Sequence, residues 1–147
     1  MTVPGCVLCE TAGGRVVVQA AKWRLIHAVE AGFPAFYRVV WQQHVREFSQ
    51  LGRDDRILLG DVLAAIEQVM LQRLHPTKVN VASLGNAVPH LHWHVIARFD
   101  WDSHFPGAVW AAPQRGEDAV RLQQVAAALP DFEAELRLAV TSKSGGS

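Results

Sequence analysis

The segment from His90 to Phe99 constrains the fold most, because imidazole and apolar side chains alternate along its first residues. Successive side chains of a β-strand point to opposite faces of the sheet. The alternation therefore predicts a strand that presents His90, His92 and His94 in a row on one face. The apolar residues between them are expected to face the core.

A row of three imidazoles has three readings. Imidazole titrates near neutrality, so the row can supply a nucleophile, hydrogen-bond donors and a proton source for attack on phosphorus. A metal site is the second reading, although side chains about 7 Å apart along one strand cannot all bind one ion at about 2 Å. One of the histidines could still join ligands from elsewhere. The third reading is an ordinary sheet, which the strict alternation disfavours.

The rest of the chain predicts one α+β domain over residues 1–141, followed by a flexible tail over residues 142–147. A long helix is indicated where apolar residues recur at spacings of mostly three and four, with Asp54 or Asp55 as its cap and Pro76 as its stop. Residues 100–113 form an aromatic-rich loop. Strands are expected at residues 15–20, 23–29, 36–41, 78–84 and 90–99, and helices at residues 54–74, 116–128 and 131–140.

The charge balance argues against binding to a highly charged partner such as nucleic acid or an anionic membrane. Lys+Arg and Asp+Glu number 14 each, so the net charge is zero, which removes the general case for binding nucleic acid or an anionic membrane. No apolar run approaches the roughly 20 residues of a membrane span. The N-terminal residues also lack the features of a signal peptide. We therefore expect a cytoplasmic protein.

Two cysteines, Cys6 and Cys9, lie three residues apart near the N-terminus. In a reducing compartment this spacing favours metal or redox chemistry over a structural disulfide. A CxxC pair alone supplies half of a zinc site, so two free thiols and a redox pair stay open as alternatives.

The run His90-Leu91-His92-Trp93-His94-Val95-Ile96 resembles the histidine triad (HIT) family pattern, in which three histidines alternate with apolar residues. Residues 80–86 upstream, and residues 33–45 before the long helix, are similar to the corresponding stretches of bacterial members, which include diadenosine tetraphosphate hydrolases. The likeness covers roughly residues 6 to 112. It implies the HIT-like fold, with an antiparallel sheet of about five strands, one long helix and short C-terminal helices.

The resemblance also assigns roles to the three histidines. It makes His92 the nucleophile that attacks a nucleoside α-phosphate and forms a nucleotidyl-histidine, which water then hydrolyses. His90 would orient the ring of His92 through its carbonyl, and His94 would contact the phosphate and help the leaving group depart. Relatives that transfer nucleotides typically have glutamine at the third position, so His94 favours hydrolysis.

The implied substrate is a purine nucleotide, either a dinucleoside polyphosphate or a nucleoside phosphoramidate. Asn80 and Asn86 are the candidate phosphate contacts, and Glu30 is the candidate ribose contact. A nucleotide-binding module with little turnover is the alternative, because many members have a supporting histidine where this chain has Phe36. That phenylalanine cannot donate a hydrogen bond to the triad.

Some relatives bind a structural zinc ion, and the resemblance carries that ligand set onto Cys6, Cys9, His44 and His90. No cofactor is implied for catalysis itself. Members typically form homodimers, and the helix 54–74 together with the aromatic segment 101–110 would suit such an interface. A protein whose histidines only hold metal is a further alternative.

Overall fold

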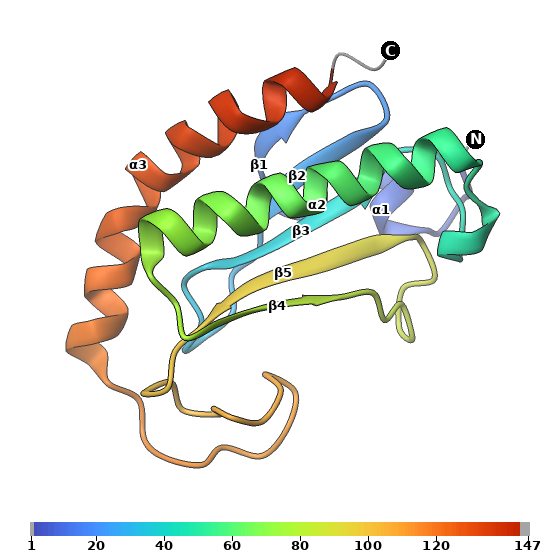
Figure 1. Ribbon diagram of the computed structural model, residues 1–147. Helices are drawn as coiled ribbons and strands as arrows, with labels where there is room; N and C mark the ends of the chain where they lie inside the picture. Colours follow the sequence, from blue (N-terminus) through green and yellow to red (C-terminus); the bar gives the residue numbers. More distant parts are fainter. Residues whose placement is uncertain (1, 145–147) are drawn as a thin grey trace.

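A five-stranded antiparallel sheet forms the centre of the computed structural model, which describes residues 2–144 (Figure 1). Its strands lie side by side in the order β1-β2-β3-β5-β4, and every neighbouring pair is antiparallel. This arrangement confirms the predicted α+β class. The strands are β1 (Arg15–Gln19), β2 (Trp23–His27), β3 (Phe36–Trp41), β4 (Lys78–Ala82) and β5 (His92–Arg98), and the helices are α1 (Val7–Glu10), α2 (Arg53–Leu74) and α3 (Ala119–Ser144).

Helices α2 and α3 cover one face of the sheet (Figure 1). Side chains that alternate along the strands, such as Tyr37, Val39 and Val95, pack there against the helices. Each large apolar side chain that is fully buried contributes roughly 1.5–3 kcal/mol. This core fixes which face of each strand is left for the other side of the sheet.

Helix α2 matches the predicted long helix, but its start is built differently. Gly52 is the N-cap residue and supplies no side-chain cap, whereas Asp54 and Asp55 lie in the first turn. There their carboxylates are favourable to the helix dipole. The helix ends at Leu74, followed by His75 in the left-handed conformation.

Among the described residues, no helix combines the length and apolar character needed to cross a membrane.

The C-terminal region is one helix, so the prediction of two short helices is wrong. Pro130 lies inside α3, where it removes a backbone hydrogen bond at a cost of about 3 kcal/mol. An unbroken buried stripe on both sides of the proline offsets this cost: Val125, Leu129, Phe132, Leu136 and Val140. The helix extends to Ser144, into the segment predicted as a tail, and residues 145–147 lie outside the described residues.

The face of the sheet opposite α2 and α3 carries the polar groups. On β3, Phe36, Arg38 and Val40 point to this face, and they pair with Ile96, His94 and His92 of β5. Strand β5 begins at His92 rather than at residue 90. The prediction of three histidines in one row is therefore wrong for His90, which precedes the strand and whose ring lies against Cys6 and Cys9.

Candidate active site

A cavity of about 500 Å³ lies over the polar face of the sheet. This volume is within the range of small-molecule sites. His92 and His94 form part of its wall, and their ring centroids are 5.1 Å apart. The full lining consists of Val7, Leu8, Gly13, Arg38, Leu84, Gly85, Asn86, Ala87, Val88, His92, His94 and Trp110.

The protonation of His92 is set by its neighbour in the chain. Its Nδ1 lies 2.6 Å from the carbonyl oxygen of His90, and because a carbonyl only accepts, Nδ1 carries the proton. Burial lowers the pKa of His92, so the ring is neutral at neutral pH. Its Nε2 therefore holds an unshared electron pair, as a nucleophile requires.

The ring of His94 has the opposite tautomer. The Nε of Arg38 donates to Nδ1 of His94 over 3.4 Å, which leaves the proton on Nε2. Burial, followed by the neighbouring His92 and Arg38, lowers the pKa of His94 to about 4. His94 is thus a neutral N–H donor beside the neutral ring of His92.

Phe36 and Arg38 divide the task of supporting His94. Phe36 is fully buried and meets the His94 ring edge-on, with centroids 5.6 Å apart. The guanidinium of Arg38 lies 5.3 Å from the centre of the Phe36 ring. Phe36 therefore packs against the His94 ring, and Arg38 donates the hydrogen bond to that ring.

His90 is fully buried and faces the N-terminal segment instead of the cavity. Its Nε2 lies 2.6 Å from the carbonyl oxygen of Trp41, so Nε2 carries the proton and Nδ1 is left unprotonated. Burial lowers the pKa of His90, which keeps the ring neutral. A neutral imidazole whose outer N–H is held by a carbonyl is oriented as in many metal ligands.

Four side chains near the N-terminal segment could hold a metal ion, because one ligand atom of each lies within 4.8 Å of the other three. They are Cys6, Cys9, His44 and His90. Sγ of Cys9 is 3.3 Å from Nδ1 of His44 and 3.5 Å from Nδ1 of His90. Tetrahedral zinc places such sulfur and nitrogen atoms about 3.5 Å apart. The four side chains assemble as the resemblance implies and fit a zinc ion.

Arg24 fixes the segment that carries the two cysteines. This arginine is buried on β2, and its guanidinium donates to the carbonyl oxygens of Leu8, Thr11 and Ala12. The short helix α1, which ends at Glu10, is thereby attached to the sheet. Leu8, on the same helix, forms part of the cavity wall. The four residues Cys6, Cys9, His44 and His90, called the cysteine cluster below, therefore share a boundary with the cavity.

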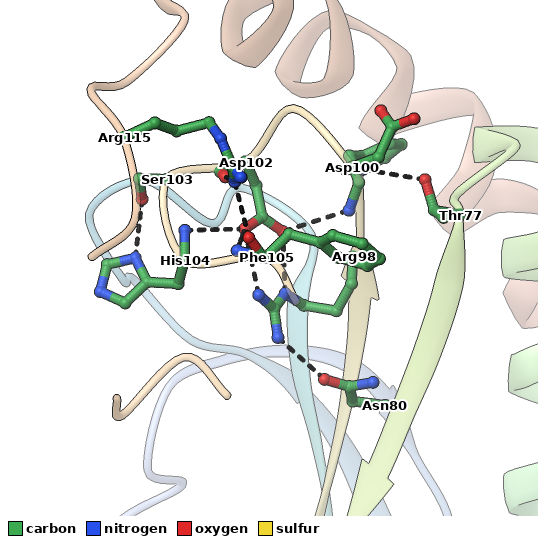
Figure 2. A network of polar contacts seen from close by, with 10 residues as sticks. Thr77, Asn80, Arg98, Asp100, Asp102, Ser103, His104, Phe105 and Arg115 are labelled. Atoms are coloured by element: carbon green, nitrogen blue, oxygen red, sulfur yellow. Dashed lines mark hydrogen bonds and ion pairs between the residues drawn. The ribbon is translucent and has the colours of Figure 1, made fainter. Parts of the chain in front are cut away.

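The loop after β5 is anchored by a buried ion pair, which Figure 2 shows. Arg98 binds both carboxylate oxygens of Asp102 at 2.8 and 3.0 Å, and both side chains are 2% exposed. The same carboxylate accepts from the backbone N–H groups of Phe99, His104 and Phe105. This anchored loop carries Trp110, whose ring lies 5.0 Å from the ring of His94.

The predicted substrate contacts are distributed unequally. Asn86 lines the cavity, after Gly85 has turned the backbone with a positive φ of 76°. Asn80 lies on the same face of the sheet, but its carboxamide oxygen accepts from Arg98, 3.0 Å away (Figure 2). Glu30 is exposed in the turn between β2 and β3. Neither Asn80 nor Glu30 is part of the cavity lining.

Sequence reasoning missed Arg38 as part of the site, and it placed the aromatic segment that contains Trp110 at a homodimer interface rather than in the site of its own chain. The alternation along β3 contained a signal for Arg38, because a charged residue between Tyr37 and Val39 must lie on the face opposite the core. Its pairing with His94 depends on strand order, which the sequence does not reveal.

A family model described as the HIT domain matches residues 11–101. Among solved structures, a histidine triad protein from Marinobacter aquaeolei VT8 is similar at 26% identity, covering 85% of this chain and 92% of that one with a TM-score of 0.66. A histidine triad protein from Bradyrhizobium japonicum has 23% identity, covers 88% and 92%, and gives a TM-score of 0.67.

A third solved structure is described as zinc-bound. A Zn-bound histidine triad family protein from Mycobacterium smegmatis has 16% identity, covers 88% of this chain and 96% of that one, and gives a TM-score of 0.58. At this identity the likeness establishes the shared fold alone. No curated protein matches the chain in sequence.

Proposed function

The chain belongs to the histidine triad family, and on that premise we propose that it is a hydrolase that cleaves a nucleoside α-phosphate from its leaving group. The family in general contains nucleotide hydrolases and transferases. The leaving group would be the remainder of a dinucleoside polyphosphate or the amine of a nucleoside phosphoramidate.

The observation that carries this proposal is the state of His92. Its Nδ1 proton is committed to the carbonyl of His90, and its free Nε2 belongs to a ring on the cavity wall. In the proposed reaction Nε2 forms a bond to the α-phosphorus while the bond to the leaving group breaks, and the leaving group keeps the electron pair. Water then cleaves the nucleotidyl–nitrogen bond, which releases the nucleoside monophosphate and regenerates the imidazole.

Other residues take supporting roles in this proposal. His94 would donate from Nε2 to the phosphate and assist departure of the leaving group. Asn86 is the first candidate for a direct substrate contact, since it lines the cavity. Asn80 and Glu30 would contact only those parts of a substrate that extend beyond the cavity lining.

The zinc ion is proposed as a structural component. Bound by Cys6, Cys9, His44 and His90, it would cross-link the N-terminal segment to the start of β5. The family pattern also favours a homodimer and a cytoplasmic location. Light scattering coupled to size exclusion tests the homodimer directly.

The enzymatic proposal is tested by incubating the protein with diadenosine tetraphosphate and, separately, with AMP linked to tryptamine, and by measuring AMP release. We expect hydrolysis of at least one substrate and a loss of about 10⁴-fold or more in His92→Ala. Brief reaction followed by intact-mass measurement should detect a nucleotidyl adduct in the wild type only. The exposed His75, changed to Asn, serves as the matched control.

If wild type and His92→Ala release AMP equally, or if neither does, the hydrolase proposal fails. Nucleotide binding that raises the melting temperature without turnover or adduct would point to a binding module instead.

A further inference from the structure

Arg38 holds a central place in the candidate site that no triad role accounts for. It lies on β3, directly opposite His94 in the register of the sheet, and its side chain lines the cavity. Strand β3 is in the middle of the sheet and is bonded to β2 and β5. The guanidinium is therefore presented to the cavity from a rigid element.

Three arginines project from this face of the sheet, and they differ in how their donors are satisfied. Arg98 is bound to two carboxylate oxygens and one carboxamide. Arg24 is bound to three backbone carbonyls and one carboxamide. Within residues 2–144, Arg38 has a single acceptor, the weakly bonded Nδ1 of His94 at 3.4 Å, and no carboxylate within 4 Å.

An arginine has five N–H donors in a planar fork that matches phosphate oxygens. Burial lowers the pKa of Arg38 while Glu30 acts in the opposite direction. An arginine side chain keeps its charge at neutral pH. His94 beside it is neutral at that pH. The positive charge of the cavity wall therefore comes from Arg38, with donors left over for an anionic ligand.

We propose that Arg38 binds a phosphate group of the leaving group, so that the site selects nucleotides whose α-phosphate is bonded to a polyphosphate chain. This inference rests on the proposed hydrolase function. Arg38 adjoins His94, the residue assigned to the departing group, and it lies on the neighbouring strand from the nucleophile.

The two substrate classes place different demands on that position. When the phosphorus–oxygen bond of a polyphosphate breaks, the bridging oxygen takes the electron pair and negative charge builds on the departing phosphate. A fixed cation stabilises this charge. When the phosphorus–nitrogen bond of a phosphoramidate breaks, the nitrogen takes the electron pair and a proton and leaves as an amine, which gains nothing from a nearby guanidinium.

The test compares kcat/KM for diadenosine tetraphosphate and for AMP linked to tryptamine in wild type, Arg38→Gln and Arg38→Lys. In Arg38→Gln we expect a loss of about 30-fold on the polyphosphate, the range of a charged hydrogen bond, and less than about threefold on the phosphoramidate. Arg38→Lys should fall between, because it keeps the charge without the fork. Arg53→Gln, an exposed arginine at the start of α2, is the control.

A second readout does not depend on turnover. Inorganic tripolyphosphate should bind the wild type by calorimetry and bind Arg38→Gln about 30-fold more weakly, with both proteins melting alike. Equal losses on both substrates would overturn the inference, as would unchanged kinetics or a wild-type preference for the phosphoramidate. If the wild type hydrolyses neither substrate, the hydrolase proposal fails separately, and tripolyphosphate binding still decides whether Arg38 is an anion site.

Discussion

The cysteine cluster contains His90 and the cavity contains His92 and His94, so neighbouring residues of one chain segment belong to both regions, yet their imidazoles are oriented in opposite ways. At His90 the Nε2 proton is held by Trp41, and Nδ1 faces the sulfur atoms. At His92 the Nδ1 proton is held by the carbonyl of His90, and Nε2 is left for the cavity. The two regions thus present opposite ring nitrogens of the same residue type, and the backbone carbonyl that each ring contacts decides which nitrogen is free.

The two regions are also joined through His90. Its ring belongs to the cluster and its carbonyl oxygen accepts from Nδ1 of His92, so we expect a change in the cluster to alter the orientation of the His92 ring. The reverse is not expected, since no ligand atom of the cluster is bonded to the His92 or His94 ring within the described part of the chain. Three experiments separate the regions.

The largest effect is expected from Cys9→Ser, which removes one of four candidate zinc ligands. We expect the free energy of unfolding to fall by about 4 kcal/mol, which lowers the melting temperature by about 10 °C in a chain of this length. Calorimetry with and without a chelator, together with metal analysis, measures the change.

The matched comparison for that experiment is His92→Ala, which should retain its metal and respond to the chelator like the wild type. A wild type that contains no zinc and is indifferent to both chelator and added zinc would contradict a structural metal in the cluster.

The second effect concerns pH. The pKa of His94 is about 4 in the folded protein against 6.5 when unfolded, so between these values the unfolded chain binds a proton that the folded chain does not. Stability should therefore fall by about 3 kcal/mol as the pH drops from above 6.5 towards 4. Urea unfolding at a series of pH values measures this slope, and His94→Asn should flatten it. An equal slope in the variant would show that His94 is not the group responsible.

The smallest effect is expected at Trp110, which is 53% exposed and contacts both His94 and Phe36. In Trp110→Ala we expect KM to rise about fivefold while stability changes by less than about 1 kcal/mol, because about half of the residue is exposed in the folded protein. Val120→Ala, at an exposed apolar residue of α3, is the control. A large drop in melting temperature would indicate that the ring is a core element.

Much of the architecture could be predicted from local pattern. All five strands lie where β-branched and apolar runs, or the alternation over residues 90–99, predicted them, and helix α2 lies where three- and four-residue spacing predicted it. Burial of one face imposes such periods on a sequence. Helix α3 was misjudged since a proline signals a break locally. The energetic cost of Pro130 is outweighed by apolar contacts that α3 makes on either side of the proline, and these contacts form only when the helix packs against the rest of the fold.

The sequence by itself determined the alternating histidines, the CxxC pair and the alternation of side chains between the two faces along β3, because these follow from backbone geometry and residue order. The tertiary structure alone decided that His90 leaves the row for the cysteines, that Arg38 is paired with His94, and that Trp110 is placed against the same ring. Such placements depend on strand order and on loops that fold back from distant positions. Contacts between residues far apart in the chain leave no periodic trace in a single sequence.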